Sequence, residues 1–136
     1  MSFDEPKVIL CADSDPRVLG RLCRLLGGAG YGTLACGSGF DALRMALQYH
    51  PDILILDAAL NDLDGWSALH AIYRMLPASR PPALILGRDA GDLLRAELAG
   101  AAGCVVKPFT ETTLAAAVSR AFNAHALRAL RPPDCC

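Results

Sequence analysis

The stretch Pro51-Asp52-Ile53-Leu54-Ile55-Leu56-Asp57 decides the fold class of this chain. Its four consecutive large apolar residues, Ile53 to Leu56, are typical of a strand buried on both faces, as in a parallel sheet covered by helices. The strand ends on Asp57, and open α/β sheets keep their functional sites at the carboxyl ends of their strands. Asp57 is therefore a candidate functional residue, although an Asp in this place can also simply cap the next turn.

The composition indicates one domain with a substantial core. The chain has 136 residues, of which 53% are apolar, and a formal net charge of −1. That charge balance does not favour binding to nucleic acid or to an anionic membrane. No run approaches the roughly 18 to 20 apolar residues of a membrane-spanning helix, and the acidic amino end does not resemble a signal peptide. We therefore expect a cytoplasmic protein with neither nucleic acid nor membrane as a partner.

Strand-like and helix-like segments alternate along the chain. Predicted strands cover residues 7–12, 33–36, 53–57, 83–86 and 104–106, and predicted helices cover 16–26, 39–48, 66–76, 93–98 and 111–130. Asp15, Ser38 and Thr110 are suited to cap the first, second and last of these helices. Alternation at this spacing predicts an α/β fold, a flavodoxin-like, doubly wound, five-stranded parallel sheet with five helices, (βα)5, in strand order 2-1-3-4-5.

Polar side chains follow three of the predicted strands. Asp13, Ser14 and Asp15 follow the first strand, Asp57 ends the third, and Lys107 follows the fifth. Carboxylates gathered at one point are tolerated when a cation lies among them, and hard oxygen ligands suit Mg²⁺. Such a cluster can stabilise a phosphoryl group transferred onto Asp57. Each residue alone has a plainer role in a turn, a cap or the surface, but their occurrence together at strand ends favours a site.

The same acidic loop argues against an FMN site of the flavodoxin type. That site needs a loop after the first strand that cradles a phosphate group. The loop at residues 13–16 has no glycine and two carboxylates, so it should repel a phosphate that brings no metal.

The chain resembles the receiver domain of bacterial two-component response regulators over about residues 6–126. The matching stretches are residues 8–16, 51–57, 62–65 and 107–109. The resemblance implies that Asp57 accepts a phosphoryl group from a histidine kinase or phosphotransfer protein. It further implies that Asp13, Asp57 and the backbone carbonyl of Ala59 bind Mg²⁺. Lys107, held by an unusual peptide bond before a proline, would contact the phosphoryl group.

The chain departs from the family pattern at three places. Ser14 stands where the family has a second metal-binding acid, and Asp15 is the nearest possible substitute. Gly87, followed by Arg88, stands where the family has a Thr or Ser that binds the phosphoryl group. Cys104 stands where the family has a Tyr or Phe that swings inward on activation. The acceptor and the lysine are thus kept, while a metal ligand and both switch residues are lost.

Two hypotheses follow from these departures. In the first, the chain is an atypical receiver or pseudo-receiver that acts mainly through protein–protein interaction, with weak or absent Mg²⁺-dependent phosphorylation at Asp57. In the second, Asp57 is phosphorylated and a non-standard switch carries the signal, for example through Arg88. In both, the chain is no enzyme beyond autocatalytic phosphoryl transfer to and from Asp57. A small phosphohydrolase of the haloacid dehalogenase type is a remote third possibility, because Asp13 and Asp15 have its spacing but the chain is short for it.

The last predicted helix carries a second apolar side. Leu127 and Leu130 lie on it, with Arg120 nearby. In receivers, the fourth helix, fifth strand and fifth helix form the usual partner or dimer face. The resemblance therefore implies that these residues and Arg88 contribute to a homodimer or to docking of another signalling protein.

The ends and the cysteines complete the sequence-based description. We expect a leader at residues 1–6, a receiver domain at 7–126, and a helix extension with a disordered tail at 127–136. The chain would then be a stand-alone receiver or one cut from a longer protein. Cys135 and Cys136 are expected to be exposed thiols. The other four cysteines are expected in the core: Cys11, Cys23, Cys36 and Cys104.

Overall fold

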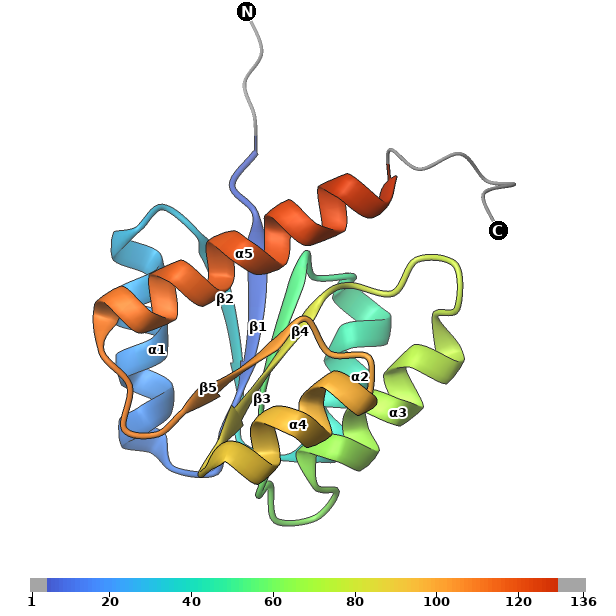
Figure 1. The fold of residues 1–136 in the computed structure, drawn as a ribbon, viewed down its shortest axis with the longest axis horizontal. Helices are drawn as coiled ribbons and strands as arrows, with labels where there is room; N and C mark the ends of the chain where they lie inside the picture. Colours follow the sequence, from blue (N-terminus) through green and yellow to red (C-terminus); the bar gives the residue numbers. More distant parts are fainter. Residues whose placement is uncertain (1–4, 130–136) are drawn as a thin grey trace, which may run out of the picture.

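The structure is a computed structural model that describes residues 5–129, with side chains described through residue 126 (Figure 1). Its strands are β1 (Val8–Ala12), β2 (Gly32–Cys36), β3 (Ile53–Asp57), β4 (Ala83–Gly87) and β5 (Gly103–Val106). Its helices are α1 (Pro16–Gly28), α2 (Gly39–Tyr49), α3 (Gly65–Met75), α4 (Ala90–Leu98) and α5 (Glu111–Ala129). All neighbouring strands are parallel, in the order β2-β1-β3-β4-β5. The predicted fold class and strand order are confirmed.

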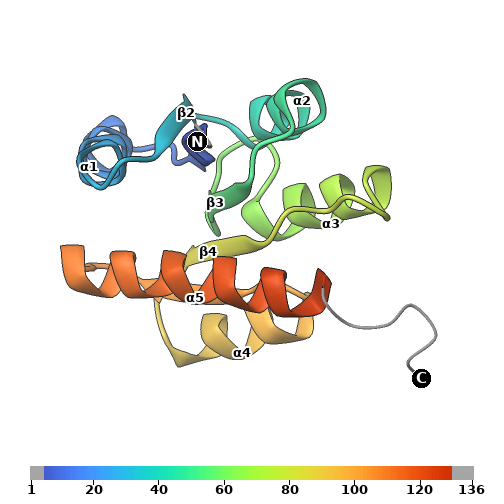
Figure 2. The same cartoon turned by 90° about the horizontal axis from the view of Figure 1, so that it is seen from above.

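Helices cover both faces of the sheet (Figure 2). The helices α1 and α5 pack on one face, and α2, α3 and α4 pack on the other. Alternate residues of each central strand enter the two cores; in β3, Ile53 and Ile55 face one core and Leu54 and Leu56 the other. Every residue of β3 is buried, as the apolar run predicts.

The predicted caps are present where the sequence places them. Asp15 caps α1 by accepting a hydrogen bond from the backbone N–H of Arg17, and Pro16 is the first helical residue. Ser38 caps α2, and the hydroxyl of Thr110 accepts the backbone N–H of Thr113 at the start of α5. These short-range hydrogen bonds satisfy helix-end donors, which is why local sequence predicts them.

Two predicted helix starts need correction. α3 begins at Gly65, after the cap Asp64, one residue earlier than predicted, and α4 begins at Ala90, after the cap Asp89, three residues earlier. Both helices open with residues that add nothing to the apolar periodicity, so the pattern detected only their later turns. The caps themselves were the signal that marks these starts.

The cysteine prediction is correct for Cys11 and Cys36, which are buried in the two cores. Cys104 is partly exposed but packs against one core, and Cys23 is partly exposed on α1. The helix extension is helical through Ala129. Leu130, the tail and its two cysteines lie outside the described residues. Within the described part of the chain, no helix combines the length and apolarity that crossing a membrane requires.

Candidate functional site

Three charged side chains meet at the carboxyl edge of the sheet, and we call them the acid–lysine cluster: Asp13, Asp57 and Lys107. The Nζ atom of Lys107 lies 2.7 Å from Oδ2 of Asp13 and 3.3 Å from Oδ1 of Asp57. Asp13 is 1% exposed and Asp57 is 8% exposed. Residues that are 94 positions apart in the chain are therefore in direct contact, because β1, β3 and β5 end at the same edge.

Asp13 organises the loop that follows β1. Its Oδ1 atom accepts a hydrogen bond of 2.8 Å from the backbone N–H of Asp15, while its Oδ2 atom accepts one from Lys107. Both oxygens of this buried carboxylate are thus hydrogen-bonded, as burial of a charge requires.

Lys107 is held in its charged form by the two carboxylates. Burial alone disfavours the ammonium, but the hydrogen bond that it donates to Asp13 and the charges of Asp57 and Asp13 outweigh this effect. The net result is that the pKa of Lys107 is raised above its usual value. The Lys107–Pro108 peptide bond is cis. The cluster therefore presents a fixed positive charge between two carboxylates.

The other two polar residues after β1 are engaged elsewhere. The hydroxyl of Ser14 donates a 3.3 Å hydrogen bond to the carbonyl of Gly37, in the loop before α2. The carboxylate of Asp15 accepts the backbone N–H of Arg17, and this bond lowers the pKa of Asp15. Neither residue forms a hydrogen bond or ion pair with the acid–lysine cluster through its side chain.

The loop between β3 and α3 is tightly packed behind Asp57. A Cβ atom on Gly65 would lie 2.2 Å from the carbonyl oxygen of Asp57, so only glycine fits there without a shift. The backbone N–H of Gly65 also donates to the carbonyl of Ala58. Asp62 holds the other side of the loop by accepting the backbone N–H of Gly39 at 2.8 Å. Ala59 is exposed in this loop.

Beside the cluster lies a corner whose residues sequence reasoning recognised only in part, and we call it the β4 corner: Gly87, Arg88, Asp92 and Cys104. A Cβ atom on Gly87 would lie 2.7 Å from both Cβ of Asp92 and Sγ of Cys104. The Oδ2 atom of Asp92 accepts a 2.8 Å hydrogen bond from the backbone N–H of Arg88. Burial and the charge of Asp92 raise the pKa of the Cys104 thiol. The corner is therefore filled, and Asp92, which the sequence analysis missed, fills much of it.

The donor set for a metal is limited. Among the described residues, no group of three or more His, Cys, Asp or Glu side chains is placed to hold a metal ion. Asp13 and Asp57 supply two carboxylates, and hard oxygen donors of this kind, with a backbone carbonyl such as that of Ala59, are the chemistry that Mg²⁺ takes. These two carboxylates and the carbonyl fit such an ion in kind.

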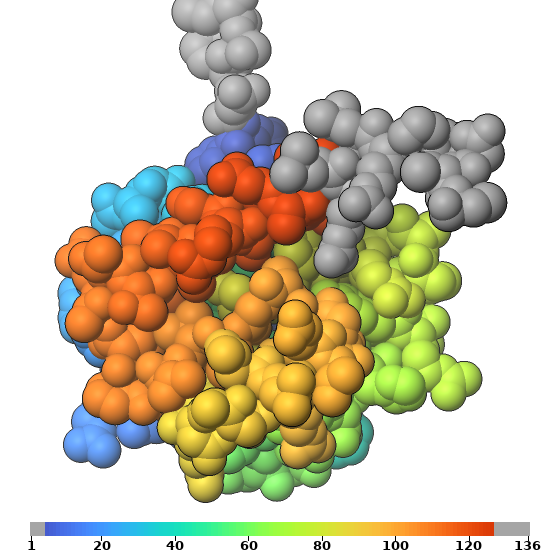
Figure 3. All heavy atoms as spheres, in the orientation of Figure 1, coloured from blue at the N-terminus to red at the C-terminus, as the bar shows by residue number. Residues whose placement is uncertain are grey.

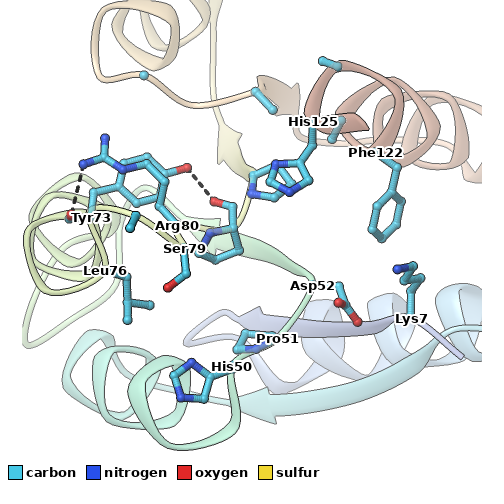
Figure 4. A pocket seen from close by; sticks show the side chains of 17 residues that line it. Lys7, His50, Pro51, Asp52, Tyr73, Leu76, Ser79, Arg80, Phe122 and His125 are labelled. Carbon is cyan, nitrogen blue, oxygen red and sulfur yellow. Dashed lines mark hydrogen bonds between the residues drawn. The ribbon is translucent and has the colours of Figure 1, made fainter. Parts of the chain in front are cut away.

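A hollow lies at the opposite, amino-terminal edge of the sheet. It has a volume of about 810 Å³ and is lined by residues such as His50, Asp52, Tyr73 and His125 (Figure 4). Several of its polar groups are already bound to nearby backbone: Asp52 accepts the N–H of Val8, and the Tyr73 hydroxyl donates to the carbonyl of Pro81. We place the candidate site at the carboxyl edge instead, because charged groups from three strands converge there.

Of the predicted partner face, Arg88 and Arg120 are exposed, whereas the side chain of Leu127 and all of Leu130 lie outside the described part of the chain. The structure adds exposed apolar side chains that the sequence analysis did not assign to this face. They are Leu93 (53% exposed), Leu94 (58%), Leu98 (80%) and Val106 (37%). Leucines spaced to fall outside the buried stripe of α4, which centres on Ala96, were the available signal.

Comparison with known proteins gives a consistent result. A family model described as the response regulator receiver domain matches residues 9–119. The chain is 35% identical over 104 residues to the transcriptional regulatory protein KdpE of Mycobacterium tuberculosis, covering 75% of this chain and 45% of that protein. It is 31% identical over 129 residues to protein Rrf1 of Nitratidesulfovibrio vulgaris, covering 95% of this chain and 92% of Rrf1. The chain thus spans about half the length of the first curated relatives it matches and nearly all of Rrf1.

Solved structures show the same architecture. A response regulator receiver domain protein from Clostridium thermocellum superposes with a TM-score of 0.78 at 26% identity, covering 89% of this chain and 98% of that chain. The chemotaxis protein CheY4 of Vibrio cholerae superposes with a TM-score of 0.79, covering 86% of this chain and 99% of that chain. At 24% identity, the second likeness bears on the fold alone.

Proposed function

The chain belongs to the response regulator receiver domain family, and from this premise we propose that it is an atypical receiver that acts mainly by binding other proteins, with weak or absent phosphorylation at Asp57. Being a receiver module of a two-component response regulator is the property shared with its relatives. The atypical part of the proposal rests on this chain's own residues.

Asp57 is the proposed phosphoryl acceptor. One of its carboxylate oxygens would form a bond to phosphorus while the P–N bond of a phosphohistidine donor, or the P–O bond of acetyl phosphate, breaks and the imidazole or acetate leaves. The ammonium of Lys107, 3.3 Å from Oδ1 of Asp57, is placed to stabilise the oxygens of the transferred group. Asp13 competes for that ammonium, because Lys107 is closer to Asp13 than to Asp57.

We propose that Asp13, Asp57 and the carbonyl of Ala59 hold Mg²⁺ weakly. Ser14 brings no charge to this site, and its hydroxyl is bound to Gly37. In its observed position Asp15 does not replace the missing acid, because its carboxylate caps α1. When bound, the ion would neutralise negative charge on the phosphoryl oxygens.

The observation that carries the proposal is the filled β4 corner. Gly87 supplies no hydroxyl to a phosphoryl group, and Asp92 and Cys104 occupy the space that a larger residue needs. A two-state switch requires a contact that differs between its states. Neither a hydroxyl at position 87 nor a ring at position 104 exists to make that contact.

A second candidate function retains phosphorylation and uses another switch. Arg88 favours it, because this exposed residue directly follows Gly87 and its guanidinium has no hydrogen-bond or ion-pair partner among the described residues. A phosphoryl group on Asp57 would attract such a cation. In either case we propose no enzymatic activity beyond phosphoryl transfer to and from Asp57, and a cytoplasmic location.

The proposed partners are a histidine kinase or phosphotransfer protein, another signalling protein, or a second copy of the chain. The helices α4 and α5 lie side by side on the surface that Figure 3 shows. This face suits such contacts, because Leu94 and Leu98 of α4 and Val106 of β5 are exposed. We expect Leu94→Asp combined with Leu98→Asp to abolish self-association or partner binding, measured by light scattering after size-exclusion chromatography and by titration with the partner. Unchanged association in both measurements would remove this face from the proposal.

The test of weak phosphorylation is the intact mass after incubation with acetyl phosphate and Mg²⁺. We expect little adduct on the parent protein and none on Asp57→Asn. Asp41→Asn, which changes an exposed acid of α2, is the matched control and should behave as the parent does. A nearly complete adduct on the parent that disappears only in Asp57→Asn would overturn the proposal of weak phosphorylation and favour the second candidate function.

A further inference from the structure

The carboxylate of Asp92, a residue of α4, lies against the end of β4. Asp92 lies in the first turn of α4 and is partly buried. Its own backbone N–H donates to the cap Asp89 at 3.1 Å, and its Oδ2 atom accepts the backbone N–H of Arg88 at 2.8 Å. Two hydrogen bonds therefore hold one residue of the helix against the chain that leads into it.

The β4 corner adjoins the acid–lysine cluster through the backbone. The N–H of Ala58, the residue after Asp57, donates to the carbonyl of Leu86 at 3.0 Å. The N–H of Lys107 donates to the carbonyl of Gly87 at 2.9 Å. The end of β4 is thus hydrogen-bonded through Leu86 to the residue after Asp57 and through Gly87 to Lys107.

An unpaired backbone N–H at such a strand end is a suitable donor for an oxyanion. In this chain the donor at Arg88 is already taken by Asp92. The same carboxylate leaves its Oδ2 atom 3.2 Å from the position that a Cβ on Gly87 would occupy. Both the donor and the space beside it are therefore used by a group of the same charge sign as a phosphoryl group.

We infer that Asp92 acts as an internal anion that opposes a phosphoryl group on Asp57 and holds the first turn of α4 against β4 whether or not Asp57 is modified. The inference rests on the proposed function, and it names the residue that keeps phosphorylation weak. Asp92 is a positioning residue here, since it acts through the Arg88 N–H and through its charge.

The test compares two substitutions at Asp92. Asp92→Asn keeps an oxygen that accepts the Arg88 N–H but removes the charge, whereas Asp92→Ala removes both. We expect the initial rate of adduct formation with acetyl phosphate and Mg²⁺ to rise about threefold or more in Asp92→Asn, the size expected for removing one partly screened like charge. Glu97→Gln removes a charge from an exposed position of α4 and should leave the rate unchanged.

A second measurement separates the charge of Asp92 from the hydrogen bond that it accepts from the Arg88 N–H. Hydrogen exchange of residues 88–95 should become faster in Asp92→Ala and stay close to that of the parent in Asp92→Asn. A purely structural role would change exchange in Asp92→Ala but would not raise the phosphorylation rate in Asp92→Asn.

The outcomes distinguish this inference from the proposed function. If Asp92→Asn forms adduct no faster than the parent, or if Glu97→Gln raises the rate equally, the inference is overturned and the proposed function stands. If the parent itself forms nearly complete adduct, the proposed function fails, and the inference survives only if Asp92→Asn is still at least threefold faster.

Discussion

The acid–lysine cluster and the β4 corner lie at the same edge of the sheet, yet different forces hold them. In the cluster, charged side chains from three strands meet at hydrogen-bonding distance. In the corner, a glycine, a thiol and a carboxylate fill the volume, with van der Waals packing around Gly87. The three charged residues thus lie beside a corner that side chains fill. Asp92 and Cys104 leave no room for a larger residue at position 87.

Gly65→Ala has the largest expected effect, and it tests whether the charged cluster also depends on tight packing, as the β4 corner does. The new Cβ would lie 2.2 Å from the carbonyl oxygen of Asp57, and backbone cannot give way easily. We expect a loss of about 3 kcal/mol or more in the free energy of unfolding, measured by urea denaturation. Gly20→Ala in α1, with no atom within 4 Å of its Cβ, should instead stabilise by about 0.5–1 kcal/mol. A mild effect of Gly65→Ala would show that the loop behind Asp57 adjusts.

Lys107→Met tests the charge that holds the cluster together. It leaves Asp13, which is 1% exposed, without its counter-charge. We expect the free energy of unfolding, measured by urea denaturation, to fall by about 2–3 kcal/mol. This loss is smaller than for a fully buried pair, because the Lys107 side chain is 28% exposed. Lys7→Met, at an exposed lysine, is the control and should change stability by less than about 0.5 kcal/mol.

The same pair of variants gives a dependence on pH. The pKa of Lys107 is raised on folding, so its contribution is fully present below the ordinary value of 10.5 and is lost as pH rises through the higher folded value. The stability difference between the parent and Lys107→Met should therefore be constant from pH 7 to about pH 10 and shrink above 10.5. A difference that already disappears near neutral pH would contradict this assignment.

Gly87→Ala tests whether packing governs the β4 corner. Its Cβ would lie 2.7 Å from Cβ of Asp92 and from Sγ of Cys104, and we expect a cost of about 1–2 kcal/mol. In a Cys104→Ala background one of the two contacts is gone, so the cost of Gly87→Ala should fall by about half. Equal costs in the two backgrounds would mean that Cys104 does not fill the corner.

Asp64→Ala has the smallest expected effect and tests the helix cap at the end of the loop behind Asp57. Asp64 accepts the backbone N–H and the hydroxyl of Ser67, each at 2.9 Å. Loss of these hydrogen bonds should lower the free energy of unfolding by about 1 kcal/mol at neutral pH. The hydrogen bond from the Ser67 N–H outweighs burial and lowers the pKa of Asp64. The contribution is therefore present above the ordinary value of 3.8 and is lost as pH falls below it, so denaturation of parent and variant should converge there. Convergence already at pH 6 would be the contrary result.

The sequence predicted those parts of the fold that depend on local patterns. The apolar run before Asp57 indicated a doubly buried strand, and the caps Asp15 and Ser38 marked two helix starts. It failed at the start of α4, where the cap Asp89 precedes a polar turn that breaks the apolar periodicity. Periodicity reports burial, so a helix turn that is mostly exposed gives little signal.

The candidate site also has a part that the sequence predicted and a part that it did not. Asp13, Asp57 and Lys107 were recognisable because each directly follows or ends a predicted strand, and parallel strands place their carboxyl ends along one edge. Sequence could not assign the engagement of Ser14 with Gly37, since a hydroxyl can bond many neighbouring carbonyls and only the packed loops select one.

By itself, the sequence determined the alternation of strands and helices, the two-faced sheet and the edge at which the charged residues gather. These follow from residue spacing and from short-range hydrogen bonds, which the chain encodes locally. Only the tertiary structure decided what occupies the β4 corner. Gly87 and Cys104 are brought together by pairing of β4 with β5, and Asp92 reaches them because α4 packs over those strands. Their close packing depends on distances of a few ångströms between separate elements, which no local pattern specifies.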